Sequence, residues 1–270
     1  MPSLFDTGIR PAVDDWLLKK AAEKRDYGSY WSASSAGYCH RKLIFERLGV
    51  PYVVKDDDAR KQRLFTAGHL FHQWMQGITK EAGLSIAQEV ELQDEDLKVR
   101  GHFDDLVLVE DRLILYDFKT RNSKNFDYAK RPSHYHKMQL GTYMYMLRQK
   151  PIPAKPTVYG EAGEIHFKPI DATSLTEART LNISKDDLRM VEVQYPYSDS
   201  VEKEVLAYWT DLNASWGLYE AQGTLPDCTC ADHENGFLAK QAWNPYWSDG
   251  QPCSIKLLEE WKNGQTSSQG

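Results

Sequence analysis

A short apolar run, Leu113 to Tyr116, leads directly into Asp117-Phe118-Lys119. Such a run, bounded by polar residues, is typical of a buried strand. Successive side chains of a strand point to opposite faces, so Asp117 and Lys119 share one face while Phe118 points to the other. The sequence therefore places a carboxylate and an amine side by side on one surface of a sheet.

A second strand-like segment, residues 99–109, lies just before this run. If residues 99–109 and 112–119 form a hairpin, the numbers of paired residues add up to 221, which sets Asp104 opposite Asp117. Directly opposed residues have Cβ atoms about 5 Å apart. Two carboxylates at that separation can bind one divalent cation, so this register predicts a metal site.

The turn between the two segments leaves a second register open. Glu110-Asp111 is not one of the residue pairs that most strongly favour a tight turn. A three-residue loop would bring Asp105 opposite Asp117 instead of Asp104. Asp105 is therefore the alternative ligand.

The composition is that of an ordinary enzyme with one sizeable core, with 270 residues of which 41% are hydrophobic. No apolar stretch approaches the roughly 20 residues needed to cross a bilayer, and no signal segment begins the chain, so we expect a cytoplasmic protein. The net charge is −6. Residues 116–150 nevertheless contain a basic strip that suits a polyanion such as DNA, made of Lys119, Arg121, Lys124, Lys130, Arg131, Lys137, Arg148 and Lys150.

The order of patterns along the chain predicts an α/β fold with a mixed central sheet flanked by helices. Helical patterns cover residues 11–25, 34–48, 59–83, 132–150 and 199–223, the last with a capping box from Asp199 to Glu202. Strand patterns cover residues 85–119, 156–170 and 188–196. We expect a single unit in three parts: a helical N-terminal region (1–84), a core (85–225) and a C-terminal lobe (226–270) with a mobile end from Asn263 to Gly270.

The acidic pair and the lysine fit the hydrolysis of a phosphodiester. The reaction needs a nucleophilic water and neutralisation of charge on the phosphoryl oxygens, tasks that a divalent cation combines. Asp104, Asp117 and the backbone carbonyl of Phe118 would leave room around magnesium for water and phosphate. Lys119 would orient the water or stabilise charge as an ammonium, or act as a base when unprotonated.

These motifs resemble the PD-(D/E)xK nuclease superfamily, in particular its RecB-like exonuclease branch with a restriction-endonuclease-like fold. Gly68-His69-Leu70-Phe71-His72 resembles the Gly-x-x-x-His helix of that branch, and implies His72 as a further metal ligand or organiser of the site. The helix motif Gln-x-x-x-Tyr is matched by Gln139 and Tyr143, which lie on one helical face. The resemblance implies that Gln139 lies near the lysine, and that Tyr143 supports this face or contacts DNA. Core packing of Tyr143 is the alternative.

Four cysteines extend the resemblance to iron–sulfur members of this branch, such as CRISPR-associated exonucleases and the AddB nuclease domain. The segment 32–42 resembles the helical entry that carries the first ligand. The implied ligands of a 4Fe-4S cluster are Cys39, Cys228, Cys230 and Cys253. The single residue Thr229 and the insertion 231–252 depart from the usual spacing. His233 is an alternative ligand, zinc an alternative metal, and unrelated buried thiols the plainest alternative. The inserted Trp243, Tyr246 and Trp247 would stack on bases or cover the metal.

The sequence thus predicts a magnesium- or manganese-dependent exonuclease that hydrolyses DNA from single-stranded ends. The resemblance alone implies a role in recombination, repair or phage DNA processing, with recombination or replication proteins as partners. A structure- or sequence-specific endonuclease is the nearest alternative. A noncatalytic DNA-binding protein with the same fold is the alternative from another class.

Overall fold

The computed structural model describes residues 9–22, 28–51, 53, 58–110, 112–149, 172–230, 246, 248 and 251–267. Its longer helices are α1 (Arg10–Ala22), α2 (His40–Leu48), α3 (Asp58–Glu81), α4 (His134–Gln149), α5 (Asp199–Gln222) and α6 (Ile255–Ser267). Short 3-10 helices are η2 (Ala33–Ser35), η3 (Ser123–Lys130) and η4 (Ala172–Ser174). None of the helices in these segments has both the length and the apolar character needed to cross a membrane.

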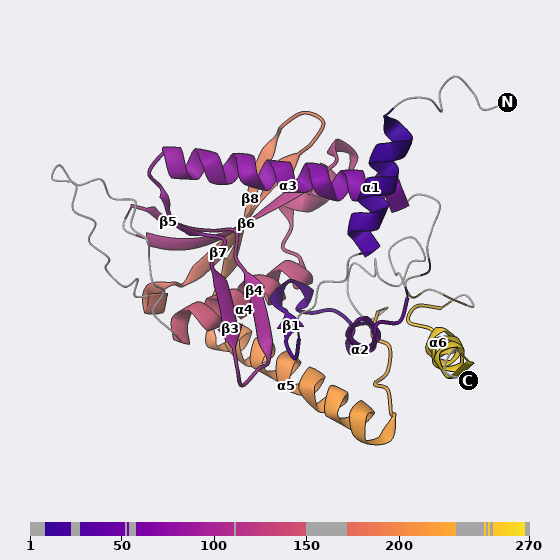
Figure 1. The fold of residues 1–270 in the computed structure, drawn as a ribbon. Helices are drawn as coiled ribbons and strands as arrows, with labels where there is room; N and C mark the ends of the chain where they lie inside the picture. Colours follow the sequence, from indigo (N-terminus) through magenta and orange to yellow (C-terminus); the bar gives the residue numbers. More distant parts are fainter. Residues whose placement is uncertain are drawn as a thin grey trace.

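A mixed five-stranded sheet forms the centre of the molecule (Figure 1). Its order is β2-β5-β6-β7-β8, and β6 and β7 are parallel while the other neighbours are antiparallel. These strands are β2 (Ser85–Gln88), β5 (Asp105–Val109), β6 (Arg112–Arg121), β7 (Glu177–Ser184) and β8 (Met190–Pro196). The predicted mixed sheet flanked by helices is confirmed.

A smaller sheet corrects the prediction of one continuous strand over residues 99–109. β4 (Val99–His102) pairs with β1 (Trp31–Ser32) and β3 (Glu91–Asp94), whereas β5 belongs to the central sheet. The chain changes sheets at Phe103-Asp104. Phe103 is buried, and this apolar anchor holds the backbone at the crossing point. Asp104 therefore lies where the two sheets meet.

Helices cover both faces of the central sheet, with α3 on one side and α4 and α5 on the other (Figure 1). Under α3, Met75 packs with Phe118, Leu181 and Ile183 of the sheet. The larger core lies on the side of α4, where the indole N–H of the buried Trp209 donates to Thr142 Oγ1 at 3.0 Å. Each face of β6 is thus covered by a helix that can bring side chains to it.

The element bounds agree with the sequence patterns for the long helices and differ at several other places. The N-cap of α5 is Ser198, whose hydroxyl accepts from the Val201 N–H, one residue before the predicted capping box. The segment predicted as the helix 34–48 is divided between η2 and α2. The sequence patterns missed β7 and α6, and α6 extends into the tail that we expected to be mobile. The predicted strands over 156–170 lie outside the described residues.

Gly101 provides a stability test at the junction between the two sheets and α4. A Cβ on Gly101 would lie 2.8 Å from Tyr143 Oη and 2.9 Å from Ala33 Cβ. We expect Gly101→Ala to lower the free energy of unfolding by about 1–3 kcal/mol through overpacking. Gly77→Ala is the matched control, because a Cβ at Gly77 in α3 meets nothing within 4 Å. Denaturant unfolding with equal midpoints for the two variants would contradict this account of the junction.

Candidate active site and cysteine cluster

The hairpin of β5 and β6 has the register in which paired residue numbers add up to 221. Its ladder runs from Val109↔Arg112 to Asp105↔Tyr116, with Glu110 in the left-handed conformation at the turn. The predicted register is therefore confirmed. Asp104 lies one residue beyond the last pair, at the level of Asp117. Because Asp104 is not paired with β6 through its backbone, its side chain can reach the edge of β6.

Both strand backbone and helix side chains hold Asp104 in place. Asp104 Oδ2 accepts from the Phe118 N–H at 2.6 Å and lies 3.3 Å from His72 Nδ1. The Gln76 amide, one helical turn after His72, donates to the Asp104 carbonyl at 3.0 Å. A Cβ on Gly68 would approach Thr120 Oγ1 to 3.3 Å, so the glycine one turn before His72 lets α3 lie close to β6. These contacts bring the Gly-x-x-x-His helix to the acidic pair.

Asp117 and Lys119 form a buried ion pair on the face of β6 that α4 covers. Lys119 Nζ donates to Asp117 Oδ1 at 2.7 Å, and the Gln139 amide donates to the same oxygen at 3.2 Å. Asp117 Oδ2 is buried and has no hydrogen-bond partner among the residues that the structure describes. A buried carboxylate oxygen without a partner is costly in free energy unless a cation or water completes it.

The carbonyl of Phe118 points into the same gap. The N–H and C=O of one strand residue point to the same side of the strand. Since the Phe118 N–H reaches the Asp104 carboxylate, the Phe118 carbonyl also faces the position where β5 has ended. Two carboxylates, one of them incompletely bonded, and a carbonyl make an all-oxygen donor set that fits magnesium or manganese.

The charges of the site act on one another. Burial raises the pKa of Asp117 to about 6, with the charge of Asp104 adding to this and Lys119 opposing it. Burial also acts on Asp104, but His72 and Lys119 outweigh it and hold the pKa of Asp104 below its ordinary value. For Lys119, the two carboxylates outweigh burial and raise its pKa. The raised pKa favours the ammonium form of Lys119 in this metal-free arrangement.

Asp105, the alternative ligand, has a different position. Its carboxylate is fully buried and accepts from Thr79 Oγ1, Ser85 Oγ and Gln88 Nε2. These bonds tie β5 to α3 and β2 on the side of the strand opposite to Asp117. The alternative assignment of Asp105 is wrong, because a carboxylate already bonded by three side chains is structural.

Tyr143 lies beneath the site and not on its surface. It is 3% exposed, and burial raises its pKa, with the charges of Asp117 and Asp104 adding to the effect. Its hydroxyl lies against Gly101 at the sheet junction. This burial favours the supporting position over contact with DNA.

Other residues of the site were missed because their signals are weak. Gln76 is one turn from His72, a spacing that could have suggested it. Glu89 accepts from the Gln76 amide at 2.6 Å and lies at the end of β2 with φ of 50°, which nothing in the sequence indicates. Arg121 was not missed, because it belongs to the predicted basic strip, and it lies on the same face of β6 as Asp117 and Lys119.

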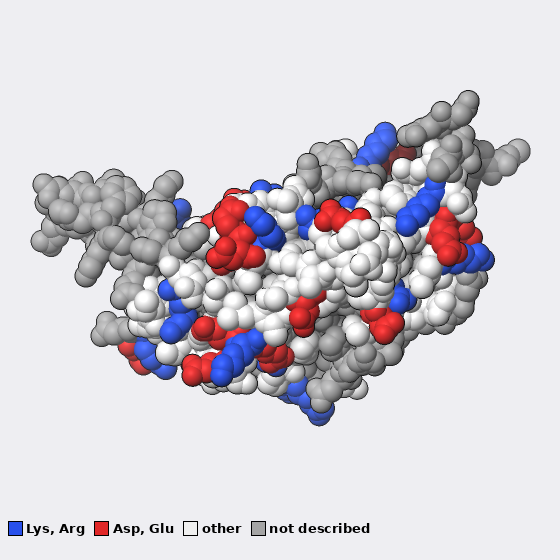
Figure 2. Space-filling view, turned by 90° about the horizontal axis from the view of Figure 1, so that it is seen from below, with Lys and Arg blue, Asp and Glu red and all other residues white. Residues whose placement is uncertain are grey.

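The predicted basic strip does not form one continuous surface. Lys137 pairs with Glu204, Lys130 pairs with Asp127, and Arg148 donates to the carbonyls of Thr173 and Leu175. Lys150 lies outside the described residues. Figure 2 shows acidic and basic side chains interspersed on one face of the molecule. The positive charges of Lys137, Lys130 and Arg148 are therefore largely engaged within the protein.

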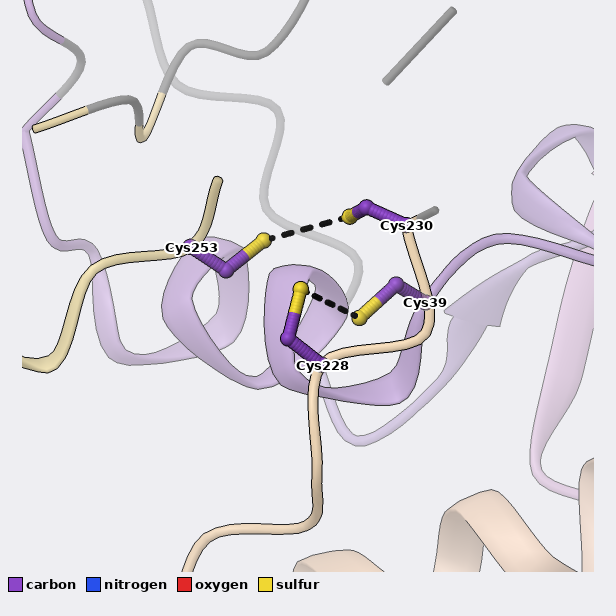
Figure 3. Close-up of side chains that lie close together, drawn as sticks. All are labelled: Cys39, Cys228, Cys230 and Cys253. Atoms are coloured by element: carbon purple, nitrogen blue, oxygen red, sulfur yellow. Dashed lines mark hydrogen bonds between the residues drawn. The ribbon is translucent and has the colours of Figure 1, made fainter. Parts of the chain in front are cut away.

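The four cysteines converge from the two ends of the chain, as Figure 3 shows. Their sulfur atoms all lie within 4.8 Å of one another. Cys39 is the N-cap residue of α2, and Cys228 and Cys230 follow α5. Cys253 precedes α6 and has φ of 48°, a strained conformation for a residue other than glycine. The cluster thus joins the N-terminal region to the last helix.

The spacing of the sulfur atoms bears on the kind of metal. The Cys39–Cys228 and Cys230–Cys253 sulfur distances are 3.9 and 3.5 Å. Four thiolates around one tetrahedral zinc, at Zn–S of about 2.3 Å, lie about 3.8 Å apart. A four-iron cluster binds each thiolate through a separate iron and holds the sulfur atoms further apart. The donor set suits either metal, and these two sulfur distances are close to those around a single zinc ion.

Of the three aromatic residues predicted to stack on bases or cover the metal, Tyr246 is among the described residues. Tyr246 is fully buried and meets Phe45 of α2 edge to face at 5.3 Å. Its ring therefore packs in the core beside the cysteines, and the base-stacking alternative is wrong for this residue. Trp243, Trp247 and His233 lie outside the described residues.

The comparison with known families agrees with the fold. The family model of the PD-(D/E)XK nuclease superfamily matches residues 57–216. The chain belongs to the PD-(D/E)XK nuclease superfamily, as its motifs predicted. The iron–sulfur branch stays a prediction. No curated protein matches the chain significantly.

Several solved structures resemble this chain weakly. The protein SSO0001 is 16% identical with a TM-score of 0.47, and the match covers 78% of this chain and 89% of that chain. An alkaline exonuclease from Laribacter hongkongensis is 14% identical with a TM-score of 0.43, covering 78% and 97%. A phage related exonuclease from Haemophilus somnus 129PT is 12% identical with a TM-score of 0.40, covering 68% and 82%. At these TM-scores the family assignment depends on the family model alone.

The raised pKa of Asp117 predicts a pH-dependent cost of the metal-free site. A carboxyl whose pKa is higher in the folded state stabilises the fold at low pH, and this contribution is lost as the pH rises through about 6. Between pH 5 and 8 we expect the metal-free protein to lose about 1 kcal/mol relative to Asp117→Asn. Unfolding curves in chelator at both pH values measure this difference. Parallel pH dependences of the two proteins would contradict the burial of an ionisable Asp117.

The cysteine cluster predicts that stability and metal content change together. We expect Cys230→Ser to lose the bound metal and more than about 2 kcal/mol of unfolding free energy, because the metal closes a long loop of the chain. Asp117→Asn serves as the control and should retain the same metal at the cysteines. Elemental analysis and visible absorbance distinguish zinc from iron. A Cys230→Ser protein with unchanged metal content and stability would show that the thiols hold no metal.

Proposed function

We propose that the protein is a magnesium- or manganese-dependent deoxyribonuclease. The observation that carries the proposal is the buried ion pair of Asp117 and Lys119, with Asp104 held beside it. One Asp117 oxygen has no hydrogen-bond partner in the described part of the chain. A fold that only needed stability would gain from apolar residues at these positions. Retention of two carboxylates and an amine at this cost favours a catalytic site over a noncatalytic DNA-binding protein.

The residues of the site divide the work of hydrolysis. A divalent cation held by Asp104, Asp117 and the Phe118 carbonyl would neutralise charge on the phosphoryl oxygens and provide an activated water. His72 and Gln76 orient Asp104 through its side chain and its backbone. Lys119, held as an ammonium, stabilises the charge that grows on the phosphate in the transition state. Gln139 fixes the Asp117 carboxylate from α4, and the buried Tyr143 supports the helix.

We further propose that the enzyme acts from DNA ends, with single strands as the preferred substrate. Cleavage from DNA ends is supported by two segments, 68–72 and 139–143, which resemble the motifs of RecB-like exonucleases. The names of two weakly similar structures, an alkaline exonuclease and a phage related exonuclease, agree with it. A role in recombination, repair or phage DNA processing follows from the same resemblance.

The cysteines form the second metal centre of the proposed enzyme. The resemblance favours a 4Fe-4S cluster, whereas the sulfur spacing favours zinc. Either metal would be structural, because the cluster ties the first and last parts of the chain together. With this link, residues 1–84, 85–225 and 226–270 would fold as one nuclease unit.

Cleavage assays test the proposed activity. We expect hydrolysis of linear single-stranded DNA with magnesium or manganese, and none in chelator. Asp117→Asn and Lys119→Met should each reduce the rate by about a hundredfold or more, because each removes charge stabilisation at the reacting phosphate. Asp127→Asn is the control, since Asp127 is an exposed carboxylate paired with Lys130.

The form of the substrate separates the alternatives. Label released progressively from 5′-labelled or 3′-labelled strands, with circular strands intact, supports an exonuclease and reveals its polarity. Cleavage of circles would instead show an endonuclease. Binding of DNA without any cleavage that depends on Asp117 would show a noncatalytic protein.

A further inference from the structure

Arg121 carries a partly buried positive charge that forms no ion pair with any carboxylate of the described residues. It is the third polar residue, after Asp117 and Lys119, on the same face of β6. Arg121 has no acidic group within 4.0 Å among the residues that the structure describes. Burial lowers its pKa, as expected for a cation that lacks a close counter-ion. The ordinary explanation of a half-buried arginine, an ion pair, therefore does not apply.

Two neutral groups hold the guanidinium in a defined orientation. Arg121 Nε donates to Asn182 Oδ1 at 3.3 Å, and one Nη2 hydrogen is directed at His136 Nε2 at 3.3 Å. Asn182 is buried and also donates to the Ala129 carbonyl and to Thr180 Oγ1. Because a guanidinium has five N–H donors, three remain without a partner among the described residues.

His136 acts as a neutral acceptor for Arg121. Burial lowers the pKa of His136 to about 2, and the charges of Lys119 and Arg121 add to this effect. Its Nδ1 lies 3.4 Å from Tyr195 Oη, which also accepts from the Ser133 N–H. This network assigns the proton to Nδ1 and leaves Nε2 to accept from Arg121. A neutral imidazole leaves the positive charge of the arginine uncompensated.

The position of Arg121 relates it to the reacting phosphate. Residues two apart on a β-strand are about 7 Å apart. Arg121 therefore follows Lys119 at a spacing close to that of successive phosphates in an extended single strand of DNA. On α4, His136 and Gln139 lie on one helical face, and they contact Arg121 and Asp117 respectively. The same helix therefore fixes both positions.

We propose that Arg121, oriented by His136 and Asn182, binds the phosphodiester next to the scissile phosphate of the DNA strand. This inference depends on the proposed nuclease function for its substrate. Planar, fixed N–H donors match the oxygens of a phosphate. Arg121 is a substrate-binding residue in this arrangement, and His136 and Asn182 are positioning residues.

The experiment compares Arg121→Gln with Arg179→Gln. Arg179 is the matched control because it lies on the opposite face of the same sheet and its guanidinium already pairs with Glu177 and Glu192. In cleavage assays, we expect Arg121→Gln to raise KM about tenfold with kcat changed less than threefold, since one charged contact made equally in both states is lost. Arg179→Gln should leave both constants unchanged.

Binding without catalysis provides the second measurement. In an Asp117→Asn background without metal, the slope of log affinity for single-stranded DNA against log salt should fall by about 0.7 in Arg121→Gln, the share of one phosphate contact. Arg121→Lys retains the charge but loses the planar set of guanidinium N–H donors. It should keep most of the salt slope, with an affinity for DNA between those of the unsubstituted Arg121 protein and Arg121→Gln. This variant tests the charge if Arg121→Gln is unstable.

The outcomes separate this inference from the proposed function. Salt slope and KM in Arg121→Gln equal to those of Arg179→Gln would overturn the phosphate site, while cleavage that depends on Asp117 would still support the nuclease. A slope that falls as expected in a protein that cleaves no substrate would keep the phosphate site and overturn the nuclease. A loss of melting temperature in Arg121→Gln with unchanged KM and slope would assign Arg121 a structural role alone.

Discussion

The placement of Asp104 beside Asp117 is the constraint on which the rest of the site depends. It arises because the chain leaves one sheet after His102 and enters the other at Asp105, so that Asp104 belongs to neither ladder. Its carboxylate accepts from the Phe118 N–H at the point where β5 no longer pairs with β6. The proposed metal site therefore depends on the sheet topology, and α3 and α4 contact it from the two faces.

The second constraint is electrostatic. Asp117, Asp104 and Lys119 lie close together in a largely buried region, where the two carboxylates repel each other and Lys119 stabilises both of them. The network is incomplete at Asp117 Oδ2. Arg121 continues the same face, and among the described residues its guanidinium has no carboxylate within ion-pair distance. The site thus combines an acidic part that fits a cation with a basic part that fits the phosphate backbone.

Much of this could be predicted from the sequence because strand alternation and hairpin register follow from simple geometry. The register sum of 221 and the grouping of Asp104 with Asp117 depended on nothing else. The sheet switch at Phe103 and the strand β7 could not be predicted, since they depend on tertiary pairing between distant segments. The contact between Arg121 and His136 joins β6 to α4. How far α4 is shifted along β6 depends on side-chain packing between them, which the sequence pattern does not reveal. The sulfur spacing of the cysteines has the same origin.

The position of a divalent cation tests the proposed metal site of Asp104 and Asp117. Crystals of the wild-type protein grown or soaked with manganese would be measured at a wavelength where manganese scatters anomalously. We expect a peak within ligand distance, about 2.0–2.6 Å, of Asp104, Asp117 and the Phe118 carbonyl oxygen. Absence of a peak at this position, or a peak bound by Asp105 instead, would contradict it.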